Sequence, residues 1–322
     1  YYQRMGRHDV SRQSIFFEPN IWLRGNAWEI KAKMNSELPD LTTMVNYRDD
    51  SNPMNIILGN MQLRNIHYYD IEGGKTFEGK KHNRLNINMG YHQTDNAVAY
   101  SLVFDKQTGV STVQPISVNG NYRIDLGIGY TRPLDKKEKL SIDNQASFNY
   151  NHNVDMAMVQ GATQSQRSIV NNWKISNVLK LNYRLDDNYE FTLHGGGTYY
   201  LIKSKREGFS NIHAGDYNIG VNVQVALPWK LQLTTDLTMF ARRGYQLSEM
   251  NTTDWIWNTQ LSRSFINKKL LVKLQGFDIL RQLSNTQYLM NAQGRTETWN
   301  NSIPRYVMLS LSWRFNVNPK KK

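Results

Sequence analysis

The sequence predicts an all-β protein, an antiparallel transmembrane β-barrel, and three observations carry this prediction. Apolar and polar residues alternate along many segments, several of these segments are long, and the connections between them alternate between short and long. Alternation places successive side chains on opposite faces of a strand. In a membrane barrel one face meets lipid and the other a wet lumen, so we expect the chain in the outer membrane of a Gram-negative cell.

The alternation is clearest in residues 305–315, near the C-terminal end of the chain. Leu309 and Leu311 would lie on one face of a strand there, while Ser310 and Ser312 would lie on the other. Helical geometry would instead scatter these residues around a cylinder. The same pattern recurs in residues 122–130, 173–184, 217–227 and 231–242.

The pattern predicts about thirteen strands, and several exceed the five or six residues that are common in globular proteins. A tilted strand needs about 9–11 residues to cross a membrane, so strand length favours a membrane barrel over a soluble sandwich. The predicted strands are 14–23, 26–34, 83–93, 97–104, 119–131, 139–152, 169–184, 188–203, 215–227, 229–242, 254–266, 269–280 and 304–315.

Connection lengths predict the orientation of the strands, because barrels have short periplasmic turns and longer extracellular loops. Counting back from the last strand, the first would also run from outside to periplasm, whereas a complete bacterial barrel has an even number of strands. We therefore expect residues 1–322 to be a single domain, the C-terminal portion of a larger barrel with strands before Tyr1, ending in a polar basic tail at 316–322. The expected short connections are 93–96, 132–138, 185–188, 227–229 and 266–268, and the long ones are 35–82, 105–118, 153–168, 204–214, 243–253 and 281–303.

The composition excludes several other classes of protein and of binding site. No apolar run reaches the roughly eighteen residues of a transmembrane helix. Cysteine is absent, which excludes a disulfide scaffold and a thiolate metal site. The net charge of +12 is compatible with nucleic acid, anionic lipid or an acidic substrate. Because the basic residues are spread along the chain, we expect outer-membrane lipid and no nucleic acid as partners.

Aromatic and basic residues have expected places in such a barrel. Tryptophans at strand ends would form the interfacial girdles, and bases on polar faces would line the lumen, since a charge facing hydrocarbon costs about 2–4 kcal/mol at mid-depth. The tryptophans are Trp22, Trp28, Trp173, Trp229, Trp255, Trp257 and Trp313. The bases are Arg123, Lys174, Lys180, Arg184, Lys230, Arg242, Lys273 and Arg314.

Two regions carry a family resemblance. Residues 50–53, Asp-Ser-Asn-Pro, precede residues 58–65, Leu-Gly-Asn-Met-Gln-Leu-Arg-Asn, and both follow the strand-like 28–34. The C-terminal strand 304–315 follows the Trp-Asn-Asn sequence of 299–301. In these segments, and over essentially its whole length, the chain resembles the C-terminal part of outer-membrane β-barrel proteins of Bacteroidota that are related to TonB-dependent receptors.

The resemblance implies a barrel of roughly twenty-two strands with a plug inside, which imports solutes with energy from the TonB complex. It also implies a surface lipoprotein as a further partner and an assembly signal at the terminal aromatic, Phe315. The sequence departs from the family in holding neither a plug nor a TonB-binding segment, so these partners would act through residues outside this chain. It also continues beyond Phe315 with the tail from Asn316 to Lys322.

The motifs of common enzymes are missing, and we expect neither catalysis nor a cofactor or metal. Gly73-Gly74-Lys75-Thr76 is similar to the end of a phosphate-binding loop, but the glycine required five residues before Gly74 is Tyr69. No Gly-x-Ser-x-Gly element is present, and the seven histidines lack the His-Glu-x-x-His spacing. A hydrolase is therefore a minor alternative.

Ligand binding would use the extracellular loops and the upper lumen wall. The candidate ligand-facing residues are Trp299, Tyr288, Arg242, His152 and His213. Receptor-type uptake of an extracellular solute is the main hypothesis. A non-transporting barrel with a structural, adhesion or secretion role and a soluble all-β binding module are the alternatives, and the strand lengths disfavour the second of them.

Overall fold

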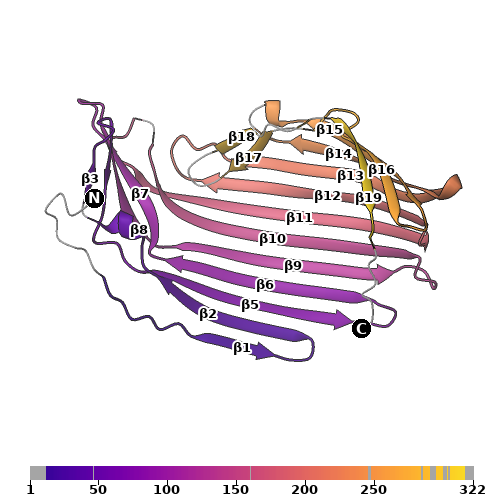
Figure 1. Cartoon of the computed structure of the whole chain (residues 1–322). Coiled ribbons are helices and arrows are strands. Elements are labelled where there is room, and N and C mark those ends of the chain that lie inside the picture. The colour runs from indigo at the N-terminus through magenta and orange to yellow at the C-terminus, as the bar shows by residue number, and fades with distance from the viewer. Residues whose placement is uncertain are drawn as a thin grey trace, which may run out of the picture.

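A curved, thirteen-stranded antiparallel sheet forms most of the molecule (Figure 1). The computed structural model describes residues 12–45, 47–159, 161–245, 248–283, 286–290, 295–299, 303 and 305–315. Within these residues no pairing joins the two outermost strands, so the sheet is open. In spatial order its strands are β1 (Asn20–Arg24), β2 (Trp28–Glu37), β5 (Ile66–Glu78), β6 (Arg84–Asp95), β9 (Asn121–Pro133), β10 (Leu140–Ala157), β11 (Gln166–Asp186), β12 (Tyr189–Ser204), β13 (Ile212–Leu227), β14 (Leu231–Arg243), β15 (Thr253–Phe265), β16 (Leu270–Phe277) and β19 (Tyr306–Trp313).

Many of these strands are long enough to cross a bilayer. β10 has 18 residues and β11 has 21, well above the roughly 9–11 that a tilted strand needs. No helix in the described part of the chain is long and apolar enough to cross a membrane. The prediction of an all-β, antiparallel membrane sheet is confirmed.

The register separates a polar from an apolar face, because residues paired across antiparallel strands share a side of the sheet. Large hydrophobic side chains stay uncovered on the apolar face: Ile175 is 53% exposed, Ile219 51% and Leu311 68%. Such exposure suits contact with lipid. One row of the polar face runs Lys31, Glu72, Gly90, Asp125, Asn149 and Lys174 across six strands.

The connections distinguish the two ends of the sheet. At one end, here the turn end, short segments join neighbouring strands: 25–27, 79–83, 134–139, 187–188, 228–230 and 266–269. At the other, the loop end, the connections are 38–65, 96–120, 158–165, 205–211, 244–252 and 278–305. In outer-membrane barrels the turn end faces the periplasm and the loop end the exterior.

Two strand assignments made from the sequence are wrong. The predicted loop 35–82 contains β5, a thirteen-residue strand of the main sheet whose adjacent Gly73 and Gly74 interrupt the apolar alternation. The predicted strand 97–104 forms, but as β7 of a separate sheet. One wall strand was missed and one was added, so the predicted number of thirteen strands is still correct. However, β6 runs opposite to its predicted direction, and the connection 93–96, predicted as a short turn, lies at the loop end.

Smaller differences concern the chain ends and the loops. Strand β1 begins at Asn20, whereas the sequence predicted a strand from residue 14. The predicted loop 105–118 contains β8, and the predicted loop 281–303 contains the hairpin of β17 (Thr286–Met290) and β18 (Arg295–Trp299). Trp22 pairs with Lys31 and so lies on the polar face, not in the girdle predicted for it.

Loops far apart in sequence build a second, four-stranded sheet at the loop end, hereafter the loop sheet (Figure 1). Two hydrogen bonds attach neighbouring segments to this sheet: Asn60 Nδ2 donates to the Pro115 carbonyl at 2.8 Å, and the Leu102 N–H donates to Ser165 Oγ at 2.9 Å. In spatial order it contains β3 (Arg48–Asp49), β4 (Asn55–Leu58), β8 (Ser111–Val118) and β7 (Ala97–Phe104). Strands β4 and β8 are parallel. The short helix α1 (Leu41–Met44) precedes β3 in the sequence. The buried residues of the loop sheet and of the segments beside it include Met44, Ile56, Leu63, Ala99 and Pro115.

A second buried cluster lies at the loop end of β11, β12 and β13. It contains Val170, Ile202, Ile212 and Ala214, with Phe209 and Tyr245 packed against it. These two aromatic residues come from the connections 205–211 and 244–252, so the connections fold back over the polar face of the sheet.

Candidate functional site

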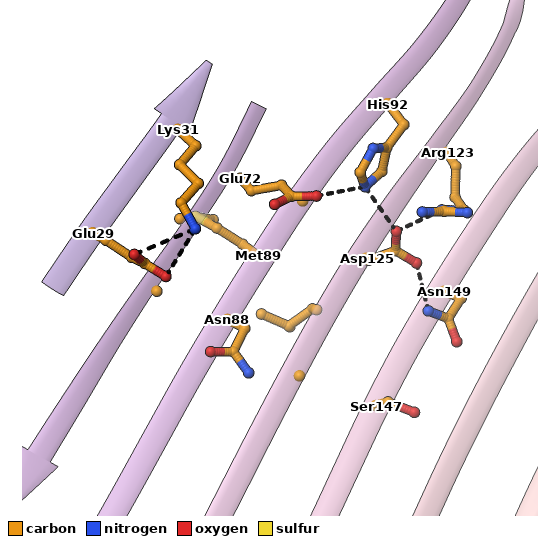
Figure 2. A pocket seen from close by; sticks show the side chains of 15 residues that line it. Glu29, Lys31, Glu72, Asn88, Met89, His92, Arg123, Asp125, Ser147 and Asn149 are labelled. Carbon is orange, nitrogen blue, oxygen red and sulfur yellow. Dashed lines mark hydrogen bonds and ion pairs between the residues drawn. The ribbon is translucent and has the colours of Figure 1, made fainter. Parts of the chain in front are cut away.

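A hollow of about 540 Å³ lies on the polar face, over β2, β5, β6, β9 and β10 (Figure 2). Its floor is low because glycines replace side chains there. At Gly90 an added Cβ would come within 3.0 Å of His92 Nε2, so a larger residue would fill the hollow. Its polar lining comes from five strands through the register: Glu29, Lys31, Glu72, Asn88, His92, Arg123, Asp125, Ser147 and Asn149.

His92 lies at the centre of the polar contacts in the hollow. Its Nδ1 is 2.6 Å from Asp70 Oδ1, and its Nε2 is 3.4 Å from Asp125 Oδ2 and 4.0 Å from Glu72 Oε1. The ring thereby bridges carboxylates on both neighbouring strands, β5 and β9. Such a bridge fixes the orientation of the imidazole and joins three strands through side chains as well as backbone.

Asp125 is the most contacted carboxylate of the hollow. It accepts from Arg123 Nε at 2.6 Å and from Asn149 Nδ2 at 2.6 Å (Figure 2). Because both of its oxygens are engaged, the carboxylate is held in one position above the sheet.

The hollow carries charges of both signs. Lys31 is 3.4 Å from Glu29 in its lining, and beside it Lys33 is 3.4 Å from Asp70. An adjoining hollow of about 310 Å³ includes Trp22, with Lys31 Nζ 5.1 Å from its ring centre. Since both signs are present, the wall offers donors and acceptors to a polar solute or to another protein segment. Among the described residues no group of three His, Cys, Asp or Glu side chains could hold a metal ion.

A second polar cluster lies at the loop end of the same face. Arg242 Nε is 3.9 Å from Asp216 Oδ1, and the Tyr245 hydroxyl donates to the same oxygen at 2.9 Å. Burial and the neighbouring Asp216 carboxylate raise the pKa of the Tyr245 phenol. The cluster anchors the connection 244–252 to the wall, above the hydrophobic cluster of Val170.

The structure separates the predicted ligand-facing residues. Arg242 lies on the polar face, whereas His152 and His213 lie on the apolar face. His152 stacks on Tyr122 at 4.9 Å and contacts Asn171 Oδ1 at 2.7 Å, so it belongs to an aromatic group and not to the lumen wall. The side chains of Trp299 and Tyr288 lie outside the described part of the structure. Phe315 follows β19 and is 81% exposed.

Sequence reasoning missed His92 and its carboxylate partners. Asp70 and Glu72 belong to β5, which had been assigned to a loop, so their approach to His92 was not visible. Only the register between β5, β6 and β9 brings these residues together.

Replacing Asp125 by asparagine should lower the free energy of unfolding by about 1 kcal/mol. The change removes the charge that Arg123 and His92 face, while half-exposure of Arg123 limits the loss. Urea unfolding in lipid vesicles would measure it. Ser147→Ala, in the same hollow, is the matched control and should change little; equal effects of the two substitutions would contradict the assigned contacts.

The sheet has long strands, an apolar and a polar face, and short connections at one end with longer ones at the other. These features define the wall of an outer-membrane barrel. A family comparison agrees: the model of the outer membrane protein beta-barrel family matches residues 23–196 and 162–313. The chain belongs to this family, and its location in the outer membrane follows. A search of curated proteins finds no match.

Proposed function

We propose that this chain is the wall and loop region of an outer-membrane receptor, related to the TonB-dependent receptors of Bacteroidota, that binds and imports an extracellular solute. The observation that carries the proposal is the hollow around His92, on a polar face whose row from Lys31 to Lys174 crosses six strands. In this proposal the chain catalyses no reaction.

The mixed charge of the hollow favours a polar solute with both hydrogen-bond donors and acceptors. Glu29, Lys31 and Glu72 are partly exposed there and can exchange their partners for those of a solute. The loop sheet, with its own buried residues, lies at the end where such a solute would arrive.

The partners in this proposal are a plug domain and the TonB complex, both engaged through residues outside this chain. A plug would contact the polar face outside the hollow, where polar groups such as Lys174 need water or polar partners. A surface lipoprotein would adjoin the loop sheet, and outer-membrane lipid would contact the apolar face.

Solute uptake tests the proposal. A strain that lacks the protein and strains complemented with wild type or Ser147→Trp would be grown on a defined mixture of oligosaccharides and peptides, and depletion of each solute would be followed by mass spectrometry. The tryptophan would fill the hollow, whereas Ser312→Trp, on the polar face of β19, lies away from it and is the control.

The wild type and Ser312→Trp should restore depletion of at least one solute, and Ser147→Trp should restore it severalfold more slowly. Equal depletion of every solute by the deletion strain and the wild type would refute the uptake proposal. If the deletion then altered adhesion or protein secretion, the barrel would have the alternative, non-transporting role.

A further inference from the structure

Three basic side chains lie together on the apolar face at the loop end of β12, β13 and β14. They are Lys203, His213 and Arg243, hereafter the basic patch. The register pairs Leu201 with His213 and Gly215 with Arg243, so the three follow a diagonal across the strands. Diagonal neighbours on a sheet are about 7–8 Å apart, which is within reach of one phosphorylated headgroup.

Two tyrosines complete the patch. The Tyr199 hydroxyl is 3.3 Å from His213 Nδ1. A Cβ at Gly215 would collide with the Tyr217 hydroxyl, so this ring lies across the glycine toward the loop end. Both phenol groups therefore lie beside the bases, with their rings toward the middle of the sheet.

The patch carries basic side chains without an acidic partner among the residues that the structure describes. In the described part of the chain none of its three members forms an ion pair, and all three are exposed. Arg243 is nevertheless held in place, because it donates to the carbonyls of Arg242 and Thr252 at 2.7 Å each. A positioned guanidinium loses little freedom when it binds an anion.

The layers below the patch match a membrane interface. Tyr199 and Tyr217 are 41% and 46% exposed, and Ile219, one step further from the loop end, is 51% exposed. From the loop end the order is therefore Lys203 and His213, then Arg243 level with Tyr199, then Tyr217, and last the aliphatic Ile219. Aromatic side chains mark the headgroup level of a bilayer, and bases bind headgroups just beyond it.

We propose that the basic patch binds the phosphate groups of an anionic glycolipid in the outer leaflet of the outer membrane. Arg243 and Lys203 pair with phosphate oxygens, and His213 and the tyrosine hydroxyls donate to the remaining polar atoms. The acyl chains then lie along Ile219 and its apolar neighbours. A soluble anion would not need this uninterrupted apolar surface beneath its site.

Lipid binding to the purified protein in detergent tests this proposal, with bisphosphorylated lipid A as the probe and native mass spectrometry or microscale thermophoresis as the readout. The double variant Lys203→Gln, Arg243→Gln should bind about thirtyfold more weakly than wild type. The matched control is Lys75→Gln, Arg132→Gln, which removes two bases from the turn end of the same face and should keep wild-type affinity.

A charge-retaining variant, Lys203→Arg, Arg243→Lys, distinguishes loss of the site from loss of the fold and should bind within a fewfold of wild type. Lipid A without its phosphates should bind wild type and double variant equally. Unchanged affinity of the double variant, or an equal loss in the turn-end control, would overturn the proposal. So would displacement of the lipid by millimolar inorganic phosphate, which would reveal a site for a soluble anion.

Discussion

Val221→Arg should lower the free energy of unfolding in a bilayer by about 2–4 kcal/mol. Val221 lies near the middle of β13 on the apolar face, and it is 41% exposed. A guanidinium there would face hydrocarbon, where few polar partners can replace its water. The measurement is guanidinium-induced unfolding in lipid vesicles, together with the amount of protein that reaches the outer membrane.

The neighbouring Asn222→Arg is the matched control. Asn222 lies on the polar face and pairs with Asp236 on β14, which can neutralise the new charge. This variant should keep the stability and abundance of the wild type. Equal losses for Val221→Arg and Asn222→Arg would contradict the assignment of the two faces.

Leu63→Ala should release the loop sheet while the main sheet stays intact. Leu63 is 1% exposed, and removing so buried a leucine side chain costs about 2–5 kcal/mol. A small sheet of short strands has a low free energy of unfolding, so this loss should unfold it. Its amide protons should then exchange much faster than in the wild type. Hydrogen–deuterium exchange with mass spectrometry over residues 41–65 and 97–118 would measure this.

Met61→Ala is the control for the loop sheet, since Met61 lies two residues away but is 54% exposed. It should leave exchange in these residues unchanged. Native protection of the loop sheet in Leu63→Ala would show that its buried residues do not hold it together. Spread of fast exchange into β9 and β10 would show that the loop sheet and the wall unfold as one unit.

The sequence alone was sufficient to predict those strands of the main sheet in which apolar and polar residues alternate without interruption. From Tyr217 to Val225 in β13 and from Leu309 to Trp313 in β19 each apolar residue is followed by a small or polar one, as only a two-sided strand requires. The outer-membrane location followed from the same pattern, because exposed aliphatic side chains need lipid.

Other parts of the fold and of the site depend on strand pairing, which the local sequence pattern does not show. Strand β5 has Gly73, Gly74 and Lys75 in succession, so its lipid-facing side is weakly apolar and it resembled a loop. Strand β7 has the residues of a wall strand, and only its pairing with β8 places it in the loop sheet. The hollow around His92 needs the registers of four strand pairs at once, which is why its residues were not predicted from the sequence.

A cysteine scan along β13 tests the central claim most directly, namely that alternate residues face lipid and the lumen. The chain has no cysteine, so single substitutions from residue 217 to 225 can each carry one spin label in the protein reconstituted in vesicles. Labels at 217, 219, 221, 223 and 225 should be accessible to oxygen dissolved in the bilayer, and those at 218, 220, 222 and 224 to a water-soluble nickel complex. Accessibility without this two-residue period, or with the opposite phase, would contradict the account.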